Sequence, residues 1–216
     1  MPVCRHGNFI KTTKIDASLL AYIYKQGKWR AVIPVAKAIS HSGDGYLHVL
    51  IPLLLLLIAP PQTDAFFILL ATALVIETVL YWVLKNSLKR RRPQEFFLNF
   101  SSIITASDRF SFPSGHTSGT FLLATALAIV YAPPFAALYT WACLVGLSRV
   151  LLGVHFPGDT LVGALMGCSC CLLVALGRWL KPLKICRLRS LGCFLVALKI
   201  IFITWSHLAI VSTIVV

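Results

Sequence analysis

Charged side chains are scarce in this sequence of 216 residues. Only 12% of the residues are Asp, Glu, Lys or Arg, whereas 58% are hydrophobic and the mean hydropathy is +0.83. This composition excludes an ordinary soluble globular domain, in which about 25% of residues are charged. The sequence therefore predicts an integral membrane protein, and its length leaves room for one helical bundle.

Acidic residues are the scarcest of the charges. Seven Asp and Glu stand against 20 Lys and Arg, which gives a formal net charge of +13. In a membrane protein this excess favours contact with anionic lipid headgroups or anionic substrates. The sequence contains no recognition module for DNA or RNA, so we expect membrane lipids as partners and no nucleic acid.

Neither the cysteines nor the N-terminal segment carries a familiar pattern. Four of the seven cysteines fall within apolar runs, where Cys packs as a small hydrophobic side chain: Cys143, Cys168, Cys170 and Cys171. We therefore expect no disulfide and no metal site. The first 44 residues lack an apolar signal-peptide region, so we expect insertion through the chain's own spans.

The apolar runs predict an all-α fold, a polytopic transmembrane helix bundle of about six spans. The candidate spans are approximately residues 46–59, 64–88, 117–131, 135–152, 159–179 and 191–214. Residues 16–40 mix apolar with basic side chains, which indicates a basic amphipathic helix in the membrane interface or, alternatively, a poor first span. We divide the chain into an interfacial segment, residues 1–44, and a transmembrane domain, residues 45–216.

One membrane face is expected to carry the function. The longest polar connection, about residues 89–113, joins the second and third spans, and long loops in compact proteins are usually functional or disordered. Counting the crossings puts the ends of spans two and four at the same face as the starts of spans three and five. These four ends carry nearly all of the polar residues considered next.

Cations gather at the end of the second span. Six residues separate Lys85 from Arg92, and three of the six are Lys89, Arg90 and Arg91. Taken alone, such a cluster is the positively charged flank that fixes the topology of a span.

The third span begins with Pro113-Ser114-Gly115-His116. Ser114 is placed to cap the helix, and Gly115 leaves room for a ligand to approach the first turn. A capped helix start offers free N–H groups and a positive dipole end, which together bind anions. His116 then stands where it could hand a proton to a bound phosphate, although alone this pattern is more often a plain helix cap.

The third polar segment joins spans four and five. It reads Ser148-Arg149, five residues, then His155-Phe156-Pro157-Gly158-Asp159. The spacing lets the Asp159 carboxylate accept a hydrogen bond from one ring nitrogen of His155 and leaves the other nitrogen to attack. From the residues alone, either His116 or His155 could be the nucleophile.

The three segments resemble the signature motifs of the type 2 phosphatidic acid phosphatase (PAP2) superfamily. They match in order as Lys85-x6-Arg92-Pro93, Pro113-Ser114-Gly115-His116 and Ser148-Arg149-x5-His155-x3-Asp159. The resemblance implies a phosphatase without metal or cofactor, in which His155 attacks phosphorus, Asp159 holds its ring and His116 protonates the leaving oxygen. It also implies that the phosphate is bound by Lys85, Arg92, Ser114, Gly115 and Arg149.

The substrate that this resemblance implies is a lipid phosphate monoester or diphosphate. Phosphatidic acid, phosphatidylglycerol phosphate, undecaprenyl diphosphate and lipid A all remain open, and so does a soluble sugar phosphate. The alternative function is a non-catalytic lipid-binding or transport protein of the same fold; the superfamily's soluble haloperoxidases are disfavoured by the composition.

The resemblance also implies a bacterial inner membrane and an active site outside the cytoplasm. The basic residues between positions 178 and 189 favour that orientation, because they would keep their loop inside. The basic residues of the N-terminal segment and of positions 89–92 oppose it.

Further polar residues lie near the expected site. Asp108 and Arg109 could close over a lipid headgroup or form a solvated loop pair. His48, with His41 and Asp44, could line a headgroup pocket or be a plain interfacial residue.

Glu77 lies inside the second span, where a carboxylate is a functional candidate by default. Because it lies about two helical turns before Lys85, we expect it to form a structural hydrogen bond within the bundle, with Lys199 as an alternative partner.

Overall fold

The computed structural model describes residues 14–25, 31–58, 61–98, 100–106, 108–131 and 137–179, which contain eight helices and no strand. The helices are α1 (Lys14–Lys25), α2 (Ile33–Ser42), α3 (Tyr46–Ile58), α4 (Thr63–Leu88), α5 (Pro93–Phe96), α6 (Gly115–Tyr131), α7 (Leu138–Leu151) and α8 (Pro157–Trp179).

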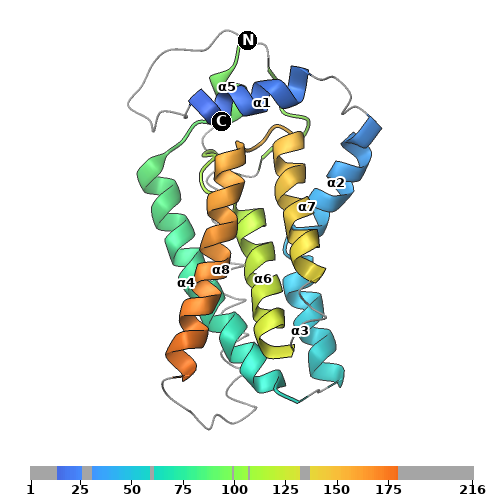
Figure 1. The fold of residues 1–216 in the computed structure, drawn as a ribbon, viewed down its shortest axis with the longest axis vertical. Coiled ribbons are helices and arrows are strands. Elements are labelled where there is room, and N and C mark those ends of the chain that lie inside the picture. The colour runs from blue at the N-terminus through green and yellow to red at the C-terminus, as the bar shows by residue number, and fades with distance from the viewer. Residues whose placement is uncertain are drawn as a thin grey trace.

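The long helices form a bundle around α6, which packs against α4, α7 and α8 (Figure 1). Glycines on α8 allow the closest of these approaches. A Cβ atom added at Gly163 would lie 2.6 Å from the Ser114 carbonyl oxygen at the start of α6. Small residues of this kind let two membrane helices come into backbone contact. The start of α6 is therefore held firmly against α8.

Apolar side chains fill the bundle interior and also cover its outside. Phe66, Leu70 and Leu122 are buried between α4 and α6, whereas Leu161 and Leu173 on α8 are exposed. By length and composition, Thr63–Phe96 and Pro157–Gly177 can cross a membrane, and α2 with α3, bent by 52°, would be a third span if the pair acts as one. An apolar exterior and helices of this length define an integral membrane protein.

Most of the predicted spans coincide with helices. Five of the six ranges correspond to α3, α4, α6, α7 and α8. The sixth, residues 191–214, lies outside the described residues. The all-helical bundle is therefore confirmed for the described part of the chain, whereas the count of six crossings stays a prediction.

The single amphipathic helix expected over residues 16–40 is wrong. Two helices occupy this range, and Pro34 stands in the first turn of the second one, where proline favours a helix start. α1 lies across the end of the bundle, next to α5, and contacts α8 (Figure 1). α2 packs against α7, and a turn at residues 43–45 leads from α2 into α3.

Candidate active site

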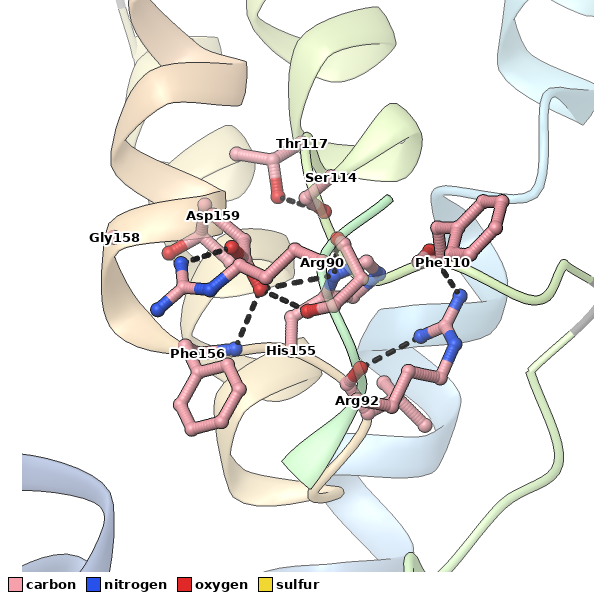
Figure 2. A network of polar contacts seen from close by, with 12 residues as sticks. Arg90, Arg92, Phe110, Ser114, Thr117, His155, Phe156, Gly158 and Asp159 are labelled. Atoms are coloured by element: carbon pink, nitrogen blue, oxygen red, sulfur yellow. Dashed lines mark hydrogen bonds and ion pairs between the residues drawn. The ribbon is translucent and has the colours of Figure 1, made fainter. Parts of the chain in front are cut away.

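The N-terminus of α8 carries a buried carboxylate that is held by three donors. Asp159 is 0% exposed and accepts hydrogen bonds from Arg90 Nη1 at 2.5 Å, from the Ser111 hydroxyl and from the Phe156 backbone N–H at 2.9 Å (Figure 2). Arg90 also binds Asp16 of α1 through Nη2 at 2.6 Å. Arg90 therefore links two carboxylates and joins α1 to the site.

His155 lies just before α8, and its tautomer follows from its contacts. The residue is 2% exposed, and Nδ1 lies 2.7 Å from the Ser111 carbonyl oxygen. Because a carbonyl only accepts hydrogen bonds, Nδ1 carries the proton and Nε2 keeps the lone pair. Burial lowers the pKa of His155 from 6.5 to about 3, and the charges of Arg92 and Arg149 add to this effect while Asp159 opposes it. The ring is therefore neutral at physiological pH.

The direct hydrogen bond expected between Asp159 and His155 is replaced by an indirect link. Asp159 Oδ2 lies 3.7 Å from His155 Nδ1, beyond hydrogen-bond distance. Ser111 stands between them, because its hydroxyl donates to Asp159 while its carbonyl accepts from His155. Ser111 belongs to the long loop before α6, and no spacing in the sequence indicated this role.

Two of the cations expected to bind phosphate meet at Asp108. Lys85, at the end of α4, and Arg92 both donate to its carboxylate, and so does the Tyr81 hydroxyl. Burial alone would raise the pKa of Asp108, but the charges of Lys85 and Arg92 outweigh it and hold that pKa well below its usual range. Arg92 is held further by the Val154 carbonyl oxygen at 2.6 Å, next to His155.

Asp108 and Arg109, expected either to close over a headgroup or to form a solvated pair, differ in their exposure. The Asp108 side chain is only 15% exposed and lies within the cation cluster. Arg109 is exposed, and its guanidinium carbon lies 5.8 Å from the ring centroid of Phe110. The solvated-pair interpretation is therefore wrong for Asp108.

The start of α6 is built by close backbone contacts. The Ser114 N–H donates to the Asp159 carbonyl oxygen at 3.1 Å, and the Ser114 hydroxyl pairs with that of Thr117 at 2.9 Å (Figure 2). A Cβ atom at Gly115 would lie 3.0 Å from Cε2 of Tyr81, so a larger residue here would need the Tyr81 ring to shift.

A cavity of about 500 Å³ opens beside the second histidine. Its lining residues are Lys37, Ser40, His41, Asp44, Tyr46, Ile104, Thr105, His116 and Arg149. Arg149, in the last turn of α7, donates to the Ser40 hydroxyl at 2.8 Å, and its Nε has no hydrogen-bond partner among the described residues. His116 Nε2 lies 2.7 Å from Asp44 Oδ1.

Some of the remaining sequence candidates line this cavity and others do not. His41 and Asp44 line it, as one of the two interpretations predicted, whereas His48 packs inside the bundle with Nε2 2.9 Å from the Gly119 carbonyl oxygen. Glu77 accepts a hydrogen bond from Ser118 at 2.5 Å, which is the kind of contact within the bundle that was expected. Lys199 lies outside the described residues.

Sequence reasoning missed two of the charged contacts at the site. Arg90 appeared only as one cation of a basic run, and Asp44 only as a possible lining residue of a headgroup pocket, without a link to His116. Nothing in the local sequence pattern indicated a buried partner for either residue. No group of three or more His, Cys, Asp or Glu side chains suited to a metal ion occurs among the described residues.

The fold and the site define an integral membrane helical bundle with His116, His155 and four buried cations at one end. The chain belongs to the PAP2 superfamily, whose family model matches residues 66–183. This range contains all three polar segments identified in the sequence.

Two curated relatives are phosphatases. The decaprenylphosphoryl-5-phosphoribose phosphatase of Mycobacterium tuberculosis (strain H37Rv) is 28% identical over 146 residues, which cover 64% of this chain and 76% of that protein. The lipid A 1-phosphatase of Rhizobium etli is 34% identical over 114 residues, 50% of this chain. The match spans 48% of that second protein, about half of its length.

Two solved structures share the fold. Aquifex aeolicus LpxE superposes with a TM-score of 0.64 at 27% identity, covering 78% of this chain and 99% of that one. The transmembrane PAP2 type phosphatidylglycerolphosphate phosphatase from Bacillus subtilis gives a TM-score of 0.63 at 24% identity, with 84% and 91% covered. At that identity the second likeness concerns the fold alone.

Proposed function

We propose that this chain is a membrane phosphatase that hydrolyses a phosphate monoester or diphosphate of a lipid, with His155 as the nucleophile. The observation that carries the proposal is the hydrogen bond from His155 Nδ1 to the Ser111 carbonyl oxygen. This bond fixes the tautomer in which Nε2 can attack, and burial keeps the ring unprotonated. Family membership supports the same role.

The phosphoryl group would be bound by the cations around His155. Lys85, Arg92 and Arg149 are buried, and the charges of the two arginines act on the His155 ring. Positive charges fixed in a buried site stabilise the phosphoryl oxygens in the transition state without reorganisation. The Ser114 hydroxyl and the Gly115 N–H, at the start of α6, would complete this set.

Two balanced steps account for hydrolysis. His155 Nε2 forms a bond to phosphorus while the bond to the lipid oxygen breaks, and His116 gives a proton to that leaving oxygen. Water then attacks the phosphohistidine and His116 takes its proton, which releases inorganic phosphate and restores His155. Asp159 and Ser111 hold the His155 ring throughout, and no metal enters either step.

A lipid substrate is supported by the membrane bundle and by the names of the relatives, which act on a decaprenylphosphoryl sugar phosphate and on lipid A. Phosphatidic acid, phosphatidylglycerol phosphate, undecaprenyl diphosphate and lipid A are the classes to compare. We propose that the active site lies at the outer face of a bacterial inner membrane. Thr105 lines the cavity, so labelling of a Thr105→Cys variant in intact cells would test this orientation.

The first experiment measures phosphate release by the detergent-purified chain in EDTA, over a panel of these lipids. We expect release that survives EDTA and disappears in His155→Ala. Glu95→Gln is the control, because that side chain is exposed and outside the proposed site, so the rate should be unchanged. Binding of these lipids without release would instead establish a lipid-binding or transport protein of this fold.

A further inference from the structure

We propose that Asp44 is a positioning residue that orients and charges His116 for proton transfer to the leaving group; this inference rests on the function proposed above. Asp44 lies outside the three family motifs, in the turn between α2 and α3. Its two carboxylate oxygens bind two different histidines. Oδ1 lies 2.7 Å from His116 Nε2, and Oδ2 lies 2.5 Å from His41 Nδ1.

The turn that carries Asp44 is held firmly in place. The Asp44 N–H donates to the His41 carbonyl oxygen at 3.0 Å, and Gly43 abuts α7 so closely that a Cβ atom there would lie 2.8 Å from Val145 Cγ1. At Gly45 the backbone has φ +93°, a left-handed conformation that suits glycine. The carboxylate is thus presented to α6 by a fixed turn.

The chemistry of a carboxylate defines what it can do for His116. An ionised carboxylate only accepts hydrogen bonds, so His116 Nε2 carries a proton that it keeps in both charge states. Nδ1 is then the nitrogen that gives its proton to the leaving oxygen. The negative charge of Asp44 stabilises the imidazolium, which is the form that a general acid needs before transfer.

Other charged groups also act on His116, and the experiment must separate Asp44 from them. The charge of Arg149 acts on His116 from α7, and the charge of Asp108 acts on it from the loop before α6. His48, on α3, also interacts electrostatically with His116. The side chains of Lys37 and His41, on α2, line the same cavity. Asp44 hydrogen-bonds to the His116 ring and so links it to the turn between α2 and α3.

The test compares two leaving groups in Asp44→Asn, which keeps the size of the side chain and removes its charge. Hydrolysis of an alkyl phosphate in micelles, whose leaving oxygen needs a proton, should fall roughly 10-fold to 100-fold, part of what a general acid supplies. Hydrolysis of a nitrophenyl phosphate, whose leaving group departs as an anion, should fall about 3-fold or less. The alkaline limb of kcat/KM for the alkyl substrate should move to lower pH, because without the Asp44 charge His116 loses its proton more readily.

Equal losses on both substrates with an unmoved alkaline limb would show that Asp44 is merely structural, and an undiminished alkyl rate would overturn the inference as well. Should Asp44→Asn fail to fold, Asp44→Glu replaces it and should retain part of the alkyl rate, because it keeps the carboxylate charge. Inactivity of the unaltered chain, or activity in His155→Ala, would instead refute the proposed function itself.

Discussion

Asp108→Asn should tighten the binding of phosphate. In the structure, Lys85, Arg92 and Tyr81 all donate to the Asp108 carboxylate, and the two cations are among the groups proposed to bind the phosphoryl oxygens. A phosphate that binds there must compete with this carboxylate. The amide keeps the shape of the side chain but removes its negative charge, so the competition weakens.

The size of the effect follows from the bonds involved. A hydrogen bond to a charged group contributes about 1.5–3 kcal/mol. The amide oxygen of the variant can still accept one neutral hydrogen bond, so we count the loss of one charged bond. At about 1.4 kcal/mol for each factor of ten, the dissociation constant of phosphate should fall roughly 10-fold to 100-fold.

The same substitution should destabilise the protein in the absence of phosphate. Removing one partner of a buried ion pair leaves the other charge uncompensated, at a cost of about 3–5 kcal/mol. The melting temperature of Asp108→Asn should therefore be lower than that of the unaltered chain. Added phosphate should raise the melting temperature of the variant by more than it raises that of the unaltered chain.

The assay is calorimetric titration of inorganic phosphate and of vanadate into the detergent-purified protein, with thermal unfolding measured on the same samples. Glu95→Gln is the control, since it removes a carboxylate charge from an exposed side chain outside the proposed site and should change neither quantity. An unchanged or weakened phosphate affinity in Asp108→Asn would refute the competition and would mean that Asp108 holds the cations in place for the phosphate.

Three more results are expected. Arg90→Ala leaves the buried Asp159 without its cation and should lower the free energy of unfolding by about 3–5 kcal/mol in denaturant titrations, with Arg90→Lys in between. Gly163→Ala should cost about 1–3 kcal/mol and reduce turnover, because its Cβ would press on the α6 backbone, whereas Gly177→Ala, with nothing within 4 Å, should change neither. The unfolded chain binds a proton at His155 near pH 6.5 and the folded chain only near pH 3, so the melting temperature should fall as pH drops through this range, and less steeply in His155→Gln.

The helices were predictable because each is a long apolar run that ends at clear signals. The second span was expected at residues 64–88, and α4 covers residues 63–88. The N-terminal segment was harder, since amphipathic residues continue across the point where Pro34 starts a new helix. The periodicity of apolar residues predicts which face of a helix is buried. It does not show where one helix ends and the next begins when the pattern continues across the break, because packing decides that.

The motif residues were predictable as a group, because all of them lie at span ends that meet at one membrane face. Their pairings were not. Asp108 lies 23 residues after Lys85, and the path of the intervening loop decides whether the two meet. The same holds for the pairs Arg90 with Asp159 and Asp44 with His116, which come from distant elements. Charge counts indicate that cations and carboxylates are present, but only the fold decides which of them neutralise one another.

The docking of α1 has a consequence for the order in which the protein is made. Asp16 Oδ1 accepts a hydrogen bond from the Gly158 N–H, 142 residues later in the chain, and Asp16 also shares Arg90 with Asp159. Contacts between such distant residues form only after the intervening chain is in place. During synthesis, the early helices can enter the membrane one by one, but the pocket around His155 closes only when α8 arrives. We therefore expect a ribosome-bound chain that ends before residue 158 to insert its early helices but to lack the completed site around His155.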